Sequence, residues 1–102
     1  MRYLYIEIYI DGDYSTIWLK NNITDNIIAA KDEILTFIRK EQPLRLHLDL
    51  KNISDINNKI IQLIIEVKKF AHIFDTKLTL HNTSDTIKAV LHNTEVGYLI
   101  ID

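Results

Sequence analysis

The sequence contains no cysteine, and it has only one proline and two glycines in 102 residues. The absence of cysteine excludes a disulfide framework, a thiolate nucleophile and a cysteine-ligated zinc site. Because proline and glycine are common in turns and loops, their scarcity predicts few long loops. Most of the chain should therefore be helix or strand. No apolar run has the length of a signal peptide or approaches the roughly 20 residues of a membrane-spanning helix. We therefore expect a cytoplasmic protein without membrane insertion.

The chain also lacks an excess of positive charge, because 12 Lys and Arg face 14 Asp and Glu. A net charge of -2 offers no electrostatic footprint for nucleic acid, which we do not expect as a partner. The sequence has no Gly-rich phosphate loop, HExxH or GxSxG motif, so we expect neither enzymatic activity nor a cofactor. Ordinary proportions of apolar and charged residues, 47% and 25%, predict a single folded domain over residues 1–102.

Alternation of apolar and polar residues predicts five strands, over residues 3–10, 14–20, 44–50, 77–81 and 98–101. Asp11-Gly12 favours a type I′ hairpin between the first two strands. The inward positions of the first four strands are aliphatic, namely Leu4, Ile6, Ile8, Ile10, Ile17, Leu19, Leu44, Leu46, Leu48, Leu78 and Leu80.

Helical spacing of apolar residues predicts three helices, over residues 24–40, over residues 55–72 and in a short segment after residue 84. Their expected N-caps are Thr24 or Asp25, Ser54 or Asp55, and Ser84. Each helix links two strands as a βαβ crossover, whose right-handedness implies sequential strand order with the first strand an antiparallel edge. Because the strands alternate, we place all three helices on one face. The prediction is a two-layer α/β fold with a mostly parallel five-stranded sheet and an N-terminal hairpin.

Several segments resemble the STAS domains, the family of bacterial anti-sigma-factor antagonists and of sulfate-transporter tails. Residues 46–54 are similar to the family's apolar-Asp-Leu strand and its turn into the signature helix. Residues 78–84 are similar to the fourth strand and its turn, and residues 21–24 lie where a Gly-Glu-Leu-Asp segment is common. The resemblance covers nearly the whole chain. It implies a bacterial signalling module that binds a protein partner, either an anti-sigma-factor-like kinase or a subunit of an assembly.

The segment 55–61 departs from the family's Asp-Ser-Ser-Gly loop at each position that carries its regulation. Asn57 takes the place of the Asp, Asn58 that of the phosphorylatable Ser, Lys59 that of the second Ser and Ile60 that of the Gly. A helix N-terminus suits regulatory phosphate, but Asn58 has no hydroxyl to accept it. We expect a non-phosphorylatable switch, with the nearest hydroxyl, Ser54, held as a helix cap.

The predicted partner-binding residues follow from this resemblance and lie at the start of the second helix, namely Asp55, Asn57, Asn58, Lys59 and Gln62. Three alternatives remain open. The loop could be an ordinary solvated helix start, the chain could be a small subunit of a transporter or signalling assembly, or the open sheet face could bind a ligand or metal.

The predicted open-face interaction residues are aromatic or basic, namely Tyr3, Tyr5, Trp18, Arg45, His47 and Tyr98. Contiguous aromatic residues with Arg are typical of protein interfaces, and a homodimer through this face is one possibility. His47 and His81 should lie on adjacent strands there, but a zinc site would need a third ligand, so we expect no metal.

Overall fold

The computed structural model describes residues 2–101 and shows a four-stranded sheet in the order β1-β2-β3-β4. β1 (Ile6–Asp11) pairs antiparallel with β2 (Tyr14–Leu19), and β3 (Arg45–Asp49) and β4 (Lys77–His81) follow in parallel. The predicted sequential order and antiparallel first strand are confirmed. A positive φ occurs at Gly12 but not at Asp13, a pattern typical of a type II′ turn rather than the expected type I′ turn.

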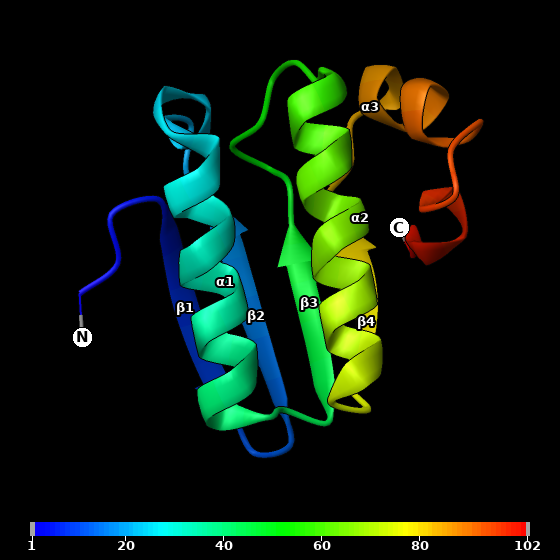
Figure 1. Cartoon of the computed structure of the whole chain (residues 1–102). Coiled ribbons are helices and arrows are strands. Elements are labelled where there is room, and N and C mark those ends of the chain that lie inside the picture. Colours follow the sequence, from blue (N-terminus) through cyan, green and yellow to red (C-terminus); the bar gives the residue numbers. More distant parts are fainter. Residues whose placement is uncertain (1, 102) are drawn as a thin grey trace.

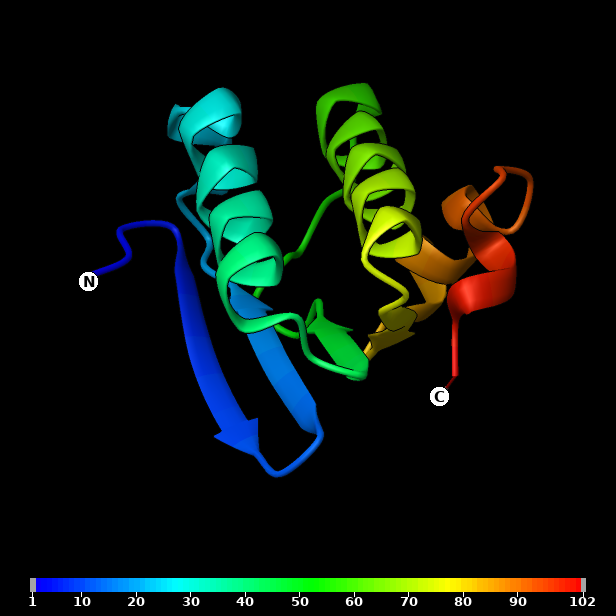
Figure 2. The same ribbon diagram turned by 60° about the horizontal axis from the view of Figure 1, so that its bottom comes forward.

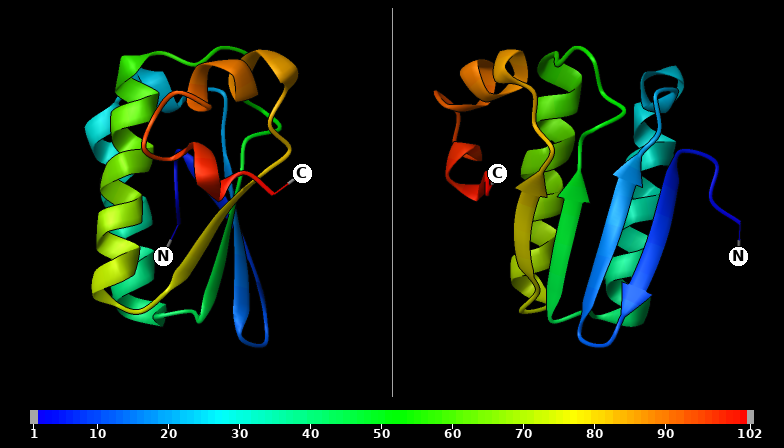
Figure 3. Two further views of the ribbon diagram at one scale, coloured as in Figure 1. Left: turned by 90° about the vertical axis from the view of Figure 1, so that its right-hand side faces the viewer. Right: turned by 180° about the vertical axis from the view of Figure 1, so that it is seen from behind.

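Two long helices cover one face of the sheet and leave the other open (Figures 1 and 3). They are α1 (Ile27–Glu41) and α2 (Asn58–Ile73), which pack side by side. The short α3 (Asp85–Leu91) lies instead beyond the carboxyl end of β4, so it does not complete the expected layer of three helices (Figure 1). No helix within residues 2–101 is long and apolar enough to span a membrane.

The core lies between the sheet and the two long helices. Its fully buried side chains come from alternate positions of β1 to β4 and from the inner stripes of α1 and α2, and they include Ile6, Ile17, Leu19, Ile34, Ile38, Leu46, Leu48, Ile64 and Leu80. Three residues predicted to point into the core are instead exposed, namely Leu4 (62%), Ile10 (54%) and Leu44 (62%). Leu4 and Leu44 precede their strands, and Ile10 lies near the hairpin tip, which extends past the end of α1 (Figure 2).

The predicted fifth strand is wrong. Residues Gly97–Leu99 form a 3-10 helix, η2, and one isolated bridge joins Ile100 to Leu80. Val96 and Leu99 are both buried, and a spacing of three is typical of a tight helical turn rather than a strand. Gly97 lies so close to α3 that an added Cβ would stand 2.6 Å from the carbonyl oxygen of Leu91.

The long helices begin later than expected. Asn26 caps α1 with its side chain accepting from the Ala29 N–H at 3.1 Å, while Thr24 and Asp25 belong to the 3-10 helix η1 (Ile23–Asp25). Asn57 caps α2 in the same way, so neither Ser54 nor Asp55 is the cap. The prediction for α3 is confirmed, because the Ser84 hydroxyl accepts from the Ile87 N–H at 3.2 Å.

Candidate functional site

The candidate site lies at the edge of the sheet where β2, β3 and β4 end and their connections lead into α1, α2 and α3 (Figure 1). Asp49, the last residue of β3, is buried and fixes two of these connections. One carboxylate oxygen accepts from the Lys51 N–H at 2.9 Å, and the other accepts from the Asn82 side-chain amide at 2.7 Å. The loops after β3 and β4 are therefore tied together by a single side chain.

The connection from β3 to α2 is held at both of its ends. Ile53 is buried, and its N–H donates to the Leu50 carbonyl at 3.0 Å. At the other end, the Asn57 side-chain oxygen accepts from the Ile60 N–H at 3.0 Å. Ser54 lies exposed between these anchors, and because Asn57 caps α2, the expectation that Ser54 is held as a helix cap is wrong.

The structure brings the five predicted partner-binding residues together on the first turns of α2 and the loop before it, where each is exposed. Asp55 and Asn57 line a hollow of about 260 Å³ on one side of the helix start. Lys59 and Gln62 line another, of about 210 Å³, between α2 and α1. Asn58 is exposed at the first position of the helix.

Sequence reasoning missed the half of this site that α1 and its preceding loop supply. Asn21 and Thr24 line the first hollow beside Asn52, and Ile28, which is 67% exposed, lines the second. A signal was available, because the carboxyl ends of adjacent parallel strands lie at one edge, which places the connection after β2 beside the connection after β3.

The first turn of α2 carries positive charge, and Asp55 adds a carboxylate just before it. The turn itself contains no acidic residue and does contain Lys59, and the free N–H groups of a helix start carry partial positive charge. Asn57 and Asn58 can both donate and accept hydrogen bonds. This surface can bind polar or acidic groups of a partner, and the only hydroxyl in segment 54–61 is that of Ser54.

The open sheet face carries three of the six residues predicted for it. Trp18 on β2 lies under the Lys51 amine, 5.6 Å from the ring centroid, while Arg45 and His47 lie on β3. His47 stands in a row of rings, 5.1 Å from Tyr14 and 4.4 Å from His81 between centroids. Burial lowers the pKa of His47, and the positive charges of His81 and Arg45 add to the effect.

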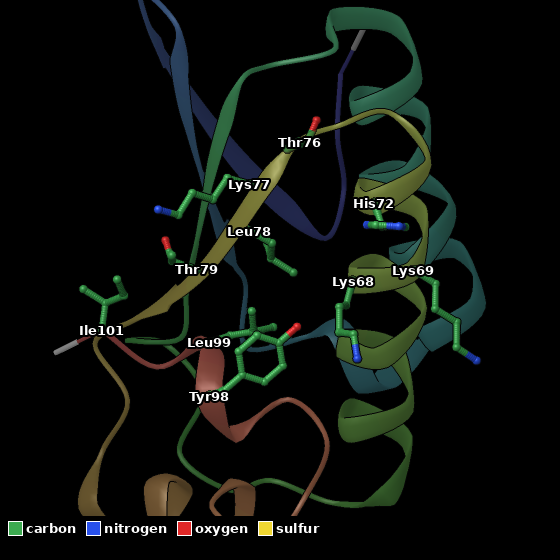
Figure 4. Close-up of a pocket in the computed structure, with 10 residues that line it drawn as sticks. All are labelled: Lys68, Lys69, His72, Thr76, Lys77, Leu78, Thr79, Tyr98, Leu99 and Ile101. Atoms are coloured by element: carbon green, nitrogen blue, oxygen red, sulfur yellow. The ribbon is translucent and has the colours of Figure 1, made fainter.

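The other three residues are not gathered there. Tyr3 and Tyr5 precede β1 and pack, half-buried, against the core. Burial raises the pKa of Tyr3, with Glu41 and Glu33 of α1 adding to it. Tyr98 lies on η2 beside α2, with the Lys68 amine 5.7 Å from its ring, and lines a groove of about 620 Å³ between β4, α2 and η2 (Figure 4).

The two open-face histidines do not form part of a metal-binding cluster. Within residues 2–101, no three His, Asp or Glu side chains are grouped so that they could hold an ion. His81 instead shares a hydrogen bond of 2.8 Å with the Thr79 hydroxyl.

No protein-family profile and no curated protein sequence matches the chain. Solved structures do match its fold. The anti-sigma factor antagonist SpoIIAA in its unphosphorylated form has a TM-score of 0.80 at 14% identity, over 95% of this chain and 86% of that chain. A variant of Moorella thermoacetica RsbS has a TM-score of 0.75 at 17% identity, over 85% and 74%. A chain of the stressosome, a signal integration and transduction hub, has a TM-score of 0.74 at 18% identity, over 84% and 76%.

These neighbours are STAS domains of the anti-sigma-factor antagonist type, which confirms the resemblance at the level of the fold. The chain has the STAS fold, with its four-stranded mixed sheet, two covering helices and a third helix at the carboxyl edge.

Proposed function

We propose that the chain is a non-enzymatic, cytoplasmic interaction module that binds a protein partner through the first turns of α2 and the adjoining loops. The observation that carries the proposal is the clustering of Asp55, Asn57, Asn58, Lys59 and Gln62 as exposed side chains between two hollows. A rigid, anchored loop beside concave surface loses little conformational entropy on binding.

The structural neighbours support a protein partner. SpoIIAA is an anti-sigma factor antagonist, and another neighbour is a chain of the stressosome. The partner we propose is correspondingly an anti-sigma-factor-like kinase or a subunit of a signalling assembly. The groove beside Lys59 and Gln62 also exposes the aliphatic side chain of Ile28, which a partner subunit could cover.

Regulation by phosphate at the start of α2 is not part of the proposal. SpoIIAA has been solved in both unphosphorylated and phosphorylated forms. In this chain Asn58 takes the place that the resemblance gives to the phosphorylatable Ser, and an amide accepts no phosphate. We propose that docking here is constitutive.

Affinity capture from the source cell tests the proposal with two matched variants. Lys59→Glu reverses a charge in the proposed site, and Lys40→Glu makes the same change at the far end of α1, where Lys40 is also exposed. We expect a protein that is captured by wild type and by Lys40→Glu but is lost with Lys59→Glu. Equal capture by both variants, or capture of no protein, contradicts the docking surface.

The aromatic half of the open face is a second candidate surface, for self-association. Tyr9 is 51% exposed and Trp18 is half-buried on neighbouring strands, and aromatic rings of this kind bury large areas at interfaces. Light scattering of wild type and Trp18→Lys tests it. A dimer that becomes a monomer supports the surface, and a wild type that is monomeric at all accessible concentrations contradicts it.

A further inference from the structure

We propose that the half of the open face formed by β3 and β4 binds a doubly charged oxyanion of the phosphate or sulfate type. The proposed site is a hollow of about 270 Å³ whose lining comes from the two strands and the C-terminal segment, namely Arg45, His47, Lys77, Thr79, His81 and Ile101. It lies apart from the start of α2 and does not depend on the function proposed there.

Strand register brings the basic side chains together. Arg45 on β3 is directly opposite Lys77 on β4, and His47 is opposite Thr79 and diagonal to His81. All of these residues occupy alternate positions that point away from the helices, as Figure 4 shows for Lys77 and Thr79, which lie on the opposite side of β4 from Leu78. Four groups that can carry positive charge therefore converge on one small area.

This arrangement is unfavourable without a counterion. Like charges directly opposite each other on neighbouring strands destabilise a sheet, and the rings of His47 and His81 are only 4.4 Å apart. Among the lining residues that the structure describes there is no Asp or Glu. The lowered pKa of His47 has the physical cause expected of such a cluster, namely burial together with nearby positive charge.

Two carboxylates, Asp49 and Asp11, lie near the cluster, but neither lines the hollow. Asp49 lies opposite His81 in the strand register, and its two carboxylate oxygens accept hydrogen bonds from the Lys51 N–H and the Asn82 side-chain amide. On β2, Tyr14 stacks on His47 and donates its hydroxyl to Asp11 at 3.2 Å. Asp11, on β1, lies opposite Tyr14 and therefore at the other end of the row of Tyr14, His47 and His81 rings from His81.

The chemistry of the donors defines the ligand. Arg45 offers a planar fork of N–H donors and Lys77 a compact ammonium, both of which bind oxyanions. The Thr79 hydroxyl can donate to the anion when a protonated His81 ring donates to it. Protonated imidazoles of His47 and His81 would add charge-assisted donors, so the anion should bind more tightly as the pH falls. A free oxyanion and a phosphorylated side chain share this chemistry.

The test is NMR of the whole chain titrated with sulfate, which stays a dianion over the pH range used, against chloride at equal ionic strength. We expect the amides of 45–49 and 77–81 to shift saturably, the ring titration of His47 to move to higher pH, and affinity to rise about tenfold from about pH 8 to about pH 5.5. A response no larger than that to chloride overturns the proposal.

Two double variants distinguish binding at this cluster from a general attraction of anions to positive charge on the protein. Arg45→Gln with Lys77→Gln removes two charges from the cluster, and Arg39→Gln with Lys40→Gln removes two exposed charges from the end of α1. Sulfate binding should weaken at least about tenfold in the first and stay unchanged in the second. Equal weakening in both contradicts the proposal, and unshifted core amides in each variant show that the fold is intact.

Two further probes distinguish the sources of the anion. Inorganic phosphate and a serine-phosphorylated peptide are titrated beside the peptide's unphosphorylated form. Both phosphates binding equally identifies a free oxyanion as the ligand, and tighter binding of the phosphopeptide identifies a phosphorylated chain. Binding of the unphosphorylated peptide as tight as that of its phosphorylated form contradicts an oxyanion site.

Discussion

The side chain of Asn57 accepts a hydrogen bond from the backbone N–H of Ile60 at 3.0 Å, and this contact sets where α2 begins. It satisfies one of the backbone N–H groups that have no partner within the helix. The proposed docking surface is built on this contact, because Asn58 and Lys59 follow directly on the first turn.

Replacing that cap should destabilise the domain without unfolding it. We expect Asn57→Ala to lower the free energy of unfolding by about 1 kcal/mol, and Asn57→Asp to retain most of it because its carboxylate also accepts from Ile60. Urea denaturation measures both. Asn58→Ala, one residue later and outside the cap contact, is the control and should change stability by less than about 0.5 kcal/mol. Equal losses at 57 and 58 would show that the cap is not the anchor.

Charge at the first position of α2 should act through the helix dipole. Asn58→Asp places a carboxylate beside free N–H groups and should raise the free energy of unfolding by about 0.5 kcal/mol at low salt, whereas Asn58→Lys should lower it. High salt should reduce both effects. Thermal denaturation at two salt concentrations measures them, and changes of the same sign for Asp and Lys would contradict the mechanism.

Asp49 should be more important for stability than its place at a strand end suggests. Asp49→Ala leaves the Lys51 N–H and the Asn82 amide without their acceptor, at a cost of about 1 to 3 kcal/mol. Asp55→Ala, which removes an exposed carboxylate nearby, should cost far less. Amide hydrogen exchange in the loops after β3 and β4 should also be faster in Asp49→Ala. Exchange rates equal to those of wild type would show that Asp49 does not hold these two loops together.

His47 should make the domain less stable in mild acid. Its folded-state pKa lies below the ordinary value of 6.5, so the unfolded chain binds a proton first as the pH falls. The contribution of neutral His47 is thus full above pH 6.5 and is lost as the pH falls through the folded-state pKa. Urea denaturation of wild type and His47→Gln from about pH 7.5 to about pH 5.5 should show the steeper loss in wild type. Parallel curves would contradict the direction of the shift.

Much of the fold follows from the sequence because one face of each strand must be buried. The register that places Ile17, Leu48 and Leu80 side by side is the one that alternation predicts, since a slip by one residue would turn every side chain to the wrong face. Crossover handedness then fixes the strand order.

The failures have local physical causes. The expected caps Ser54 and Asp55 lie in the irregular connection that follows the buried Ile53, and the helix starts only after Asn57, which caps it. Residues 98–101 have the composition of a strand, but the close approach of Gly97 to Leu91 turns the chain before it can pair along β4. Neither contact is visible in a local pattern.

Tyr98 shows why the candidate site was only partly predictable. Its place on the open face depended on the expected fifth strand, and the 3-10 helix moves it to the side of α2. The residues near 57 were predicted because the resemblance places the family's partner-binding loop in segment 55–61. Ile28, contributed by another helix, required the three-dimensional packing.

Site-specific photo-crosslinking in the source cell tests the docking claim most directly. A photoreactive residue would replace Asn58 at the start of α2, Tyr9 on the open face or Lys40 at the far end of α1, all of which are exposed. We expect one discrete protein adduct from position 58, which is lost when Lys59→Glu is added, and no such adduct from position 40. Adducts of equal yield from positions 58 and 40, or a partner captured from position 9 alone, would contradict it.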